Sequence, residues 1–134
     1  MRGKYRFDID KTISYWLESA KYDLGVAHAM LKTKKYPYAL FMGHLALEKI
    51  LKALVVKKTR THAPFSHSLA YLLERSGIKM PEPMQVRLSE FMEFHIEARY
   101  PDASRVFYKK CTKGYTEARL KEIKEVFKWI KTRL

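Results

Sequence analysis

The chain has 134 residues, 47% hydrophobic and 13% aromatic, which is enough for one domain with a packed core and argues against disorder. Its single cysteine, Cys111, excludes an intramolecular disulfide and gives no sign of an oxidising compartment or a cysteine-rich metal site. Lys and Arg number 27 against 14 Asp and Glu, a formal net charge of +13 that favours partners carrying phosphate.

The same charge has a second interpretation, because charged helix faces also serve solubility or an acidic protein partner. The cations are nevertheless clustered: residues 49–60 and 105–113 each contain several cations and no acid. Tyr108 and Tyr115 accompany the second cluster, a pattern compatible with base stacking but also common in ordinary loops.

The chain does not begin with a secretory signal pattern, and its apolar runs fall far short of the ~20 residues that a membrane span needs. We therefore expect a cytoplasmic protein without a membrane partner.

Residues 1–11 have no sustained period, and we expect a basic arm there. From residue 13 onward, apolar side chains recur at spacings of three and four, which predicts a helix capped by Asp10 or Thr12 and ending near Lys34 and Lys35. The apolar positions are Ile13, Trp16, Leu17, Ala20, Leu24, Ala27 and Leu31. The short connection that follows predicts an antiparallel neighbour.

Residues 37–58 predict the helix around which the others pack. Its apolar side chains point in so many helical directions that a single apolar stripe cannot account for them, so we expect burial on most sides. Pro37 suits the first turn, and Lys57 and Lys58 suit the carbonyl end of the helix dipole.

Three polar residues interrupt this helix at spacings of four: His44, Glu48 and Lys52. They share one face and form a polar seam. One interpretation is an ion pair between Glu48 and Lys52 with His44 bonded beside it. The other is that the seam lines a groove and presents the cation and the imidazole to a ligand.

Beyond a turn at residues 59–65, Ser66 is the expected cap of a short helix that ends at Gly77, with His67 in its first turn. Pro83 starts a further helix that ends before Pro101. Residues 103–114 form the longest nonperiodic stretch, which predicts a loop.

The last expected helix starts at Thr116 as cap and carries Leu120, Ile123, Phe127 and Ile130 at spacings of three and four. No strand pattern and no internal repeat is found. The fold class is therefore all-α: an up-and-down helical bundle of four to five helices around a central buried helix.

The motifs of several common sites are missing from the sequence. There is no Glu-x-x-His pair for a carboxylate-bridged metal site, no glycine-rich phosphate loop and no zinc-type spacing of Cys or His, so we expect neither a metal nor a cofactor. Any meeting of the histidines depends on the tertiary fold, and each alone is more often structural. They are His28, His44, His62, His67 and His95.

Four segments carry a resemblance to the HEPN domain family, the nucleotide-binding domain of higher eukaryotes and prokaryotes. They are Trp16 with Asp23 and Leu24, the stretch HLALEKILKAL at 44–54, HSL with LL at 67–73, and ARYPD at 98–102. The resemblance covers nearly the whole chain, and we expect residues 1–134 to form one domain of this kind. It implies an all-α bundle, homodimers, nucleotide or RNA binding, and pairing with a small nucleotidyltransferase in toxin–antitoxin modules.

Ribonucleases of this family resemble one another in an Arg followed after four to six residues by His, but no histidine follows Arg99. The resemblance therefore implies a noncatalytic, ligand-binding member, with Arg99 contacting phosphate, Tyr100 stacking or forming a wall, and Asp102 orienting Arg99. Arg99 and Asp102 could instead be an ion pair at the helix end.

The remaining expected ligand-binding residues are those of the seam together with His67: His44, Glu48, Lys52 and His67. Two alternatives to a nucleotide- or RNA-binding homodimer stay open. One is a metal-independent ribonuclease in which His44, His67 or His95 is the acid or base. The other is a bundle that only binds proteins.

Overall fold

The computed structural model describes residues 7–99 and 105–134, and for residues 98 and 99 it describes the backbone alone. Within these ranges the secondary structure is entirely helical. The six helices, in chain order, are α1 (Ile9–Lys32), α2 (Tyr36–Thr59), α3 (Leu69–Ser76), α4 (Glu82–Arg99), α5 (Arg105–Lys110) and α6 (Lys113–Lys131).

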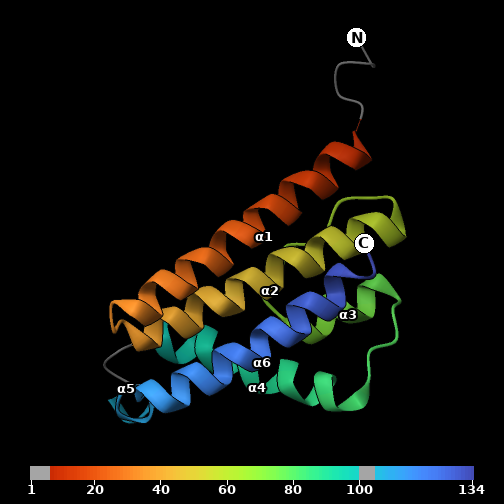
Figure 1. Cartoon of the computed structure of the whole chain (residues 1–134). Helices are drawn as coiled ribbons and strands as arrows, with labels where there is room; N and C mark the ends of the chain where they lie inside the picture. The colour runs from red at the N-terminus through yellow and green to blue at the C-terminus, as the bar shows by residue number, and fades with distance from the viewer. Residues whose placement is uncertain (1–6, 100–104) are drawn as a thin grey trace.

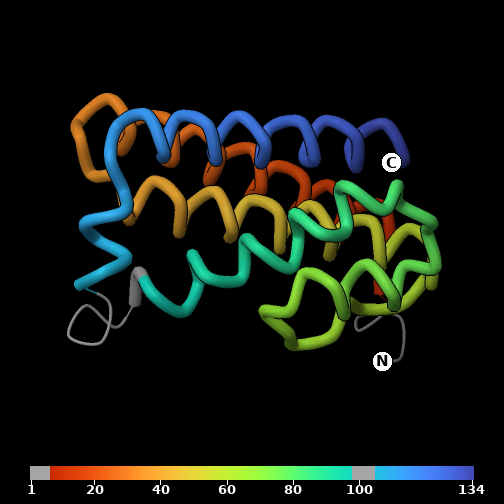
Figure 2. Tube along the Cα trace, turned by 90° about the horizontal axis from the view of Figure 1, so that it is seen from below, coloured from red at the N-terminus to blue at the C-terminus, as the bar shows by residue number. Residues whose placement is uncertain are grey.

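Helix α2 runs through the middle of the bundle and packs against α1, α3, α4 and α6 (Figures 1 and 2). Fourteen of its 24 residues are buried, so the expected central helix is confirmed. Pro37 lies in its first turn, and Lys57 and Lys58 lie in its last turn. Burial of large side chains such as Leu47 and Leu51, each 0% exposed, supplies the main stabilisation of the fold.

Helices α1 and α2 form an antiparallel hairpin closed by a tight turn (Figure 1). Lys34 in this turn has φ 63°, a left-handed conformation. Across the hairpin, Lys49 of α2 pairs with Asp23 of α1 at 2.7 Å. The other side of α2 meets α6 closely, because a Cβ added to Gly43 would lie 2.8 Å from Cδ1 of Ile123.

The helix starts differ from those expected. The N-cap of α1 is Asp8, whose carboxylate accepts from the amide of Lys11 at 3.0 Å, so residues 9–11 belong to the helix and not to an arm. The cap of α3 is Ser68, not Ser66, and His67 therefore precedes the helix. The cap of α6 is Thr112, because its hydroxyl accepts from Tyr115, while Thr116 is buried inside the helix. The Gly77 C-cap, with φ 72°, is confirmed.

The expected loop at residues 103–114 is wrong in part, because it contains α5 and the start of α6. Phe107 of α5 is buried, and its ring lies 6.0 Å from that of Phe94 on α4. One anchored aromatic side chain thus fixes a helix too short to show a period in the sequence.

Candidate functional site

Helix α2, the segment before α3, and α4 bring three histidines and one carboxylate together. We call His44, His67, His95 and Glu48 the histidine cluster. The ring of His95 lies 4.9 Å from that of His44 and 4.6 Å from that of His67 between centroids. Nδ1 of His67 lies 2.9 Å from Oε1 of Glu48. Residues far apart in sequence therefore form one connected polar group inside an apolar bundle.

The ion pair expected on α2 is present and is buried. The ammonium of Lys52 lies 3.2 Å from Oε2 of Glu48, and the two residues are 7% and 5% exposed. The same ammonium lies 5.1 Å from the centre of the Trp16 ring on α1, a cation–π contact. Lys52 is thus held between a carboxylate and an indole, and its charge is directed inward.

His44 is completely buried, and Nε2 of its ring lies 3.4 Å from the sulfur of Met92. Burial first, and then the charge that His95 can carry, lower the pKa of His44 from 6.5 to about 3, while the backbone of His67 acts in the opposite direction. The imidazole of His44 is therefore neutral at physiological pH.

Only one side chain of the cluster faces solvent to a large extent. The side chain of His67 is 58% exposed, whereas that of Glu48 is 6% exposed. A carboxylate that contacts one ring nitrogen orients the imidazole and directs the other nitrogen away from it. His67 is thus the member of the cluster that a dissolved ligand can reach.

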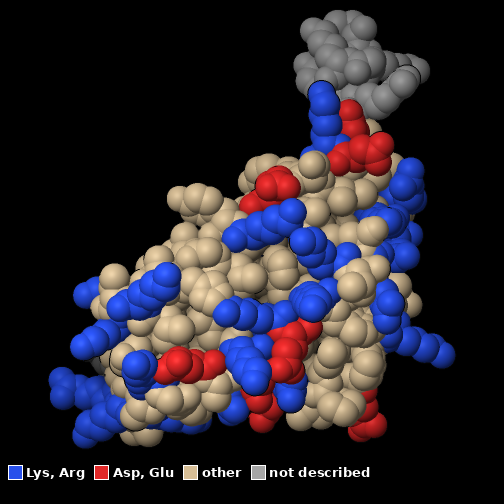
Figure 3. Space-filling model, in the orientation of Figure 1, with Lys and Arg blue, Asp and Glu red and all other residues tan. Residues whose placement is uncertain are grey.

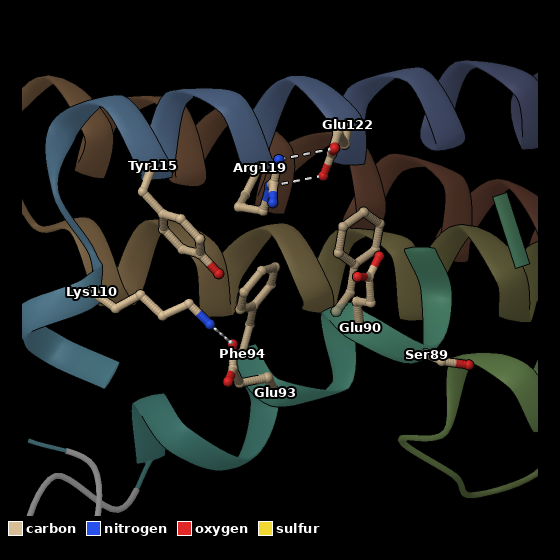
Figure 4. Close-up of a pocket in the computed structure, with 9 residues that line it drawn as sticks. Ser89, Glu90, Glu93, Phe94, Lys110, Tyr115, Arg119 and Glu122 are labelled. Atoms are coloured by element: carbon tan, nitrogen blue, oxygen red, sulfur yellow. Dashed lines mark hydrogen bonds and ion pairs between the residues drawn. The ribbon is translucent and has the colours of Figure 1, made fainter. Parts of the chain in front are cut away.

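A separate pocket of about 440 Å³ lies between α4, α5 and α6 (Figure 4). Its cations are already engaged: Lys110 bonds Glu93 at 3.2 Å, and Arg119 bonds Glu122 at 3.0 Å. Both cations also face the ring of Tyr115. With a further acid, Glu90, the lining holds three acids against two paired cations, a balance that does not favour phosphate.

The charges of α6 are sorted by face. Glu122 and Glu125 face α4, where Arg87 pairs with Glu125 at 3.1 Å. Lysines at spacings of three, four and three occupy another edge, and we call Lys121, Lys124, Lys128 and Lys131 the lysine edge. All four of these lysines are exposed. Within the described ranges, no salt bridge involves any of these four.

The lysine edge lies beside α1. The pKa of His28 on α1 is lowered by burial and then by the charges of Lys124 and Lys32, which places both cations near this imidazole. Lys and Arg side chains predominate over Asp and Glu on the face that contains α1, α2 and α6 (Figure 3). An excess of cations on one face is typical of surfaces that attract polyanions.

Comparison of the sequence and the fold with known proteins identifies the family of this chain. The sequence matches the HEPN domain over residues 13–133. The chain belongs to the HEPN domain family. The solved structures include a similar chain, described as the crystal structure of TT1696 from Thermus thermophilus, with a TM-score of 0.78 and 25% identity over 91% of this chain and 98% of that one. No curated protein matches. Within the described part of this HEPN chain, no helix is long and apolar enough to cross a membrane.

Of the expected site residues, the structure brings together His44, Glu48, Lys52 and His67. Tyr100 and Asp102 lie outside the described residues, as does the side chain of Arg99. Sequence reasoning did not place His95 in this group. The available signal was that His95 follows Leu88 and Phe91 on the apolar face of α4, where a polar side chain needs a polar partner from a neighbouring helix.

Proposed function

We propose that this HEPN protein binds RNA, or a nucleotide, through phosphate contacts. The observation that carries the proposal is the lysine edge: four exposed lysines on one side of α6, reinforced by Lys32 of α1. Regularly spaced cations are suited to a polyphosphate backbone and carry no base preference of their own. Membership of the HEPN family supports the same function.

The histidine cluster is the second part of the proposed ligand site. His67 is its exposed member, and Arg99 follows His95 by four residues at the end of α4. We propose that Arg99, Tyr100 and Asp102 provide a phosphate contact, a stacking surface and an orienting carboxylate. On this proposal, Arg99→Ala weakens binding and leaves the thermal midpoint nearly unchanged. A large fall in the midpoint with normal binding would instead identify a structural ion pair.

The test is a titration of fluorescently labelled single-stranded RNA at several salt concentrations. Phosphate-directed binding predicts that log affinity falls linearly with log salt, by about 0.7 per phosphate contacted. A flat salt response would contradict the proposal.

A metal-independent ribonuclease is the second candidate function, favoured by the contact between His67 and Glu48. An exposed imidazole oriented by a buried carboxylate can exchange a proton with substrate, whereas His44 and His95 are buried. We propose binding without cleavage, because no histidine follows Arg99 at the position of the family's nuclease motif. Cleavage of a structured RNA that disappears in His67→Ala would establish the nuclease instead.

We further propose that the protein acts as a homodimer beside a nucleotidyltransferase partner, as in toxin–antitoxin modules. Exposed aromatic side chains such as Tyr22 (74%) and Phe65 (105%) are available for such contacts. Light scattering at high protein concentration tests the dimer, and a strictly monomeric mass would refute it. Co-purification from a strain that expresses the neighbouring gene tests the partner.

A further inference from the structure

The histidine cluster has the donor atoms of a metal site. His44 and Glu48 are one turn apart on α2, and His95 comes from α4. One potential ligand atom from each of these three residues lies within 4.8 Å of those of the other two, and all three residues are buried. We propose that His44, Glu48 and His95 bind a divalent transition-metal ion of the Zn²⁺ class, with His67 at the solvent-facing edge of the site.

The donor set selects the class of ion. Two imidazoles and one carboxylate suit zinc and similar first-row metals, whereas Mg²⁺ and Ca²⁺ prefer all-oxygen sites. The pairing of Glu48 with Lys52 strengthens this choice. Since the lysine already neutralises the carboxylate, a hard cation gains little from the site's charge, while a zinc-like ion still gains the imidazole lone pairs.

The geometry needs only side-chain adjustment. Bond lengths of about 2.0 Å place neighbouring ligand atoms of a tetrahedral zinc about 3.3 Å apart. The atoms already lie within 4.8 Å of one another, so the separations have to shorten by at most about 1.5 Å, a distance that side-chain torsions can supply. The proposed ligands belong to two packed helices, α2 and α4, which hold their backbone positions.

Nδ1 of His44 is a buried polar atom in this region, and the backbone of His67 lies close enough to raise the pKa of the ring. This nitrogen makes no hydrogen bond within the described ranges. A buried polar group left unpaired costs on the order of 1 to 3 kcal/mol. The sulfur of Met92 faces Nε2 of the same ring, so Nδ1 is the atom that we assign to the metal.

The surroundings of Glu48 fit a ligating carboxylate. Oε2 accepts from Lys52, and such an outer hydrogen bond is typical of metal-bound carboxylates. Oε1 lies 2.9 Å from Nδ1 of His67, whose side chain is 58% exposed. His67 thus lies between the carboxylate of Glu48 and solvent, at the edge of the proposed site from which an ion would enter.

The experiment measures Zn²⁺ affinity by competition with a chromogenic chelator, using the full chain after treatment with EDTA. The proposal predicts one ion per chain, no competition by Mg²⁺, and a loss of at least about 100-fold in affinity for His44→Ala and His95→Ala. His28→Ala and His62→Ala are matched controls that remove histidines outside the cluster, and they should change the affinity by less than about threefold.

Cobalt provides a readout that does not depend on the folding of a variant. One equivalent of Co²⁺ added to the parent chain should give visible absorption bands of four- or five-coordinate nitrogen and oxygen ligation, and Zn²⁺ should abolish them. A parent chain that binds no Zn²⁺, or only the pale spectrum of six-coordinate Co²⁺, would overturn the proposal. So would equal losses in the cluster variants and the control variants. None of these outcomes bears on RNA binding, which is measured separately.

Discussion

Lys52→Met tests the energetic role of the buried ion pair. The substitution keeps most of the side-chain volume but leaves Glu48, 5% exposed, with His67 as its remaining partner. Removing one member of a buried pair typically costs 3–5 kcal/mol, and the surviving contact with His67 places the expected loss of unfolding free energy at about 3 kcal/mol. At about 3 °C per kcal/mol for a chain of this size, the midpoint should fall by about 9 °C.

The assay is urea unfolding followed by circular dichroism, with Lys21→Met as the matched control. Lys21 pairs with Glu18 at 3.6 Å on the surface of α1, where the side chains are 41% and 70% exposed, so its loss should cost less than about 1 kcal/mol. The double variant Lys52→Met with Glu48→Gln should recover part of the stability, because no buried charge is left unpaired. If Lys52→Met were as stable as the control, the argument that the pair is buried and coupled would be wrong.

Four other substitutions have defined outcomes. Gly43→Ala should destabilise the protein by about 1 kcal/mol, because the added Cβ would lie 2.8 Å from Cδ1 of Ile123. Gly25→Ala adds a Cβ with nothing within 4 Å and should stabilise the protein by up to about 1 kcal/mol. Equal effects of the two substitutions in thermal melts would contradict the close approach of α2 and α6. Leu51→Ala should cost about 2 to 5 kcal/mol in urea unfolding, and a loss below about 1 kcal/mol would show that the core is misplaced. In the folded chain the pKa of His44 is about 3, whereas in the unfolded chain it is about 6.5, so below pH 6.5 the unfolded chain binds one more proton than the folded chain. The free energy of unfolding in metal-free buffer should therefore fall by up to about 1.4 kcal/mol per pH unit as the pH drops below 6.5. His44→Gln should flatten this decline, and an unchanged slope in the variant would refute the prediction.

The sequence predicted the elements that depend on long apolar patterns. The breadth of apolar positions on residues 37–58 identified the central helix, because burial on most sides places apolar side chains in many helical directions. The Gly77 C-cap was equally readable, since a left-handed residue after a helix favours glycine.

Helix starts were less readable because several cap residues stand close together. Ser66 and Ser68 are both suitable N-caps for α3, and Thr112 and Thr116 are both suitable for α6. Tertiary packing decides which of them caps, because it places the first turn of each helix. Helix α5 is held by Phe107, and a single side chain produces no period in the sequence.

The candidate site was predictable only along one helix. The i, i+4 spacing indicated the pair of Glu48 and Lys52 and the position of His44 beside them. The contact between His44 and His95 depends on how α2 packs against α4, and the positions of the two residues in the sequence do not predict it. The burial of Lys52 under Trp16 depends in the same way on α1.

The central claim, that the lysine edge binds phosphate, is tested most directly by the salt dependence of RNA affinity in a triple variant. Neutralising Lys121, Lys124 and Lys128 with Ala should reduce the slope of log affinity against log salt by about 2, at about 0.7 per lost contact. The control neutralises three other exposed lysines, Lys11, Lys21 and Lys79, and so removes the same net charge. The account predicts a reduced slope for the lysine-edge variant and a nearly unchanged slope for the control; equal slopes in the two variants would contradict it.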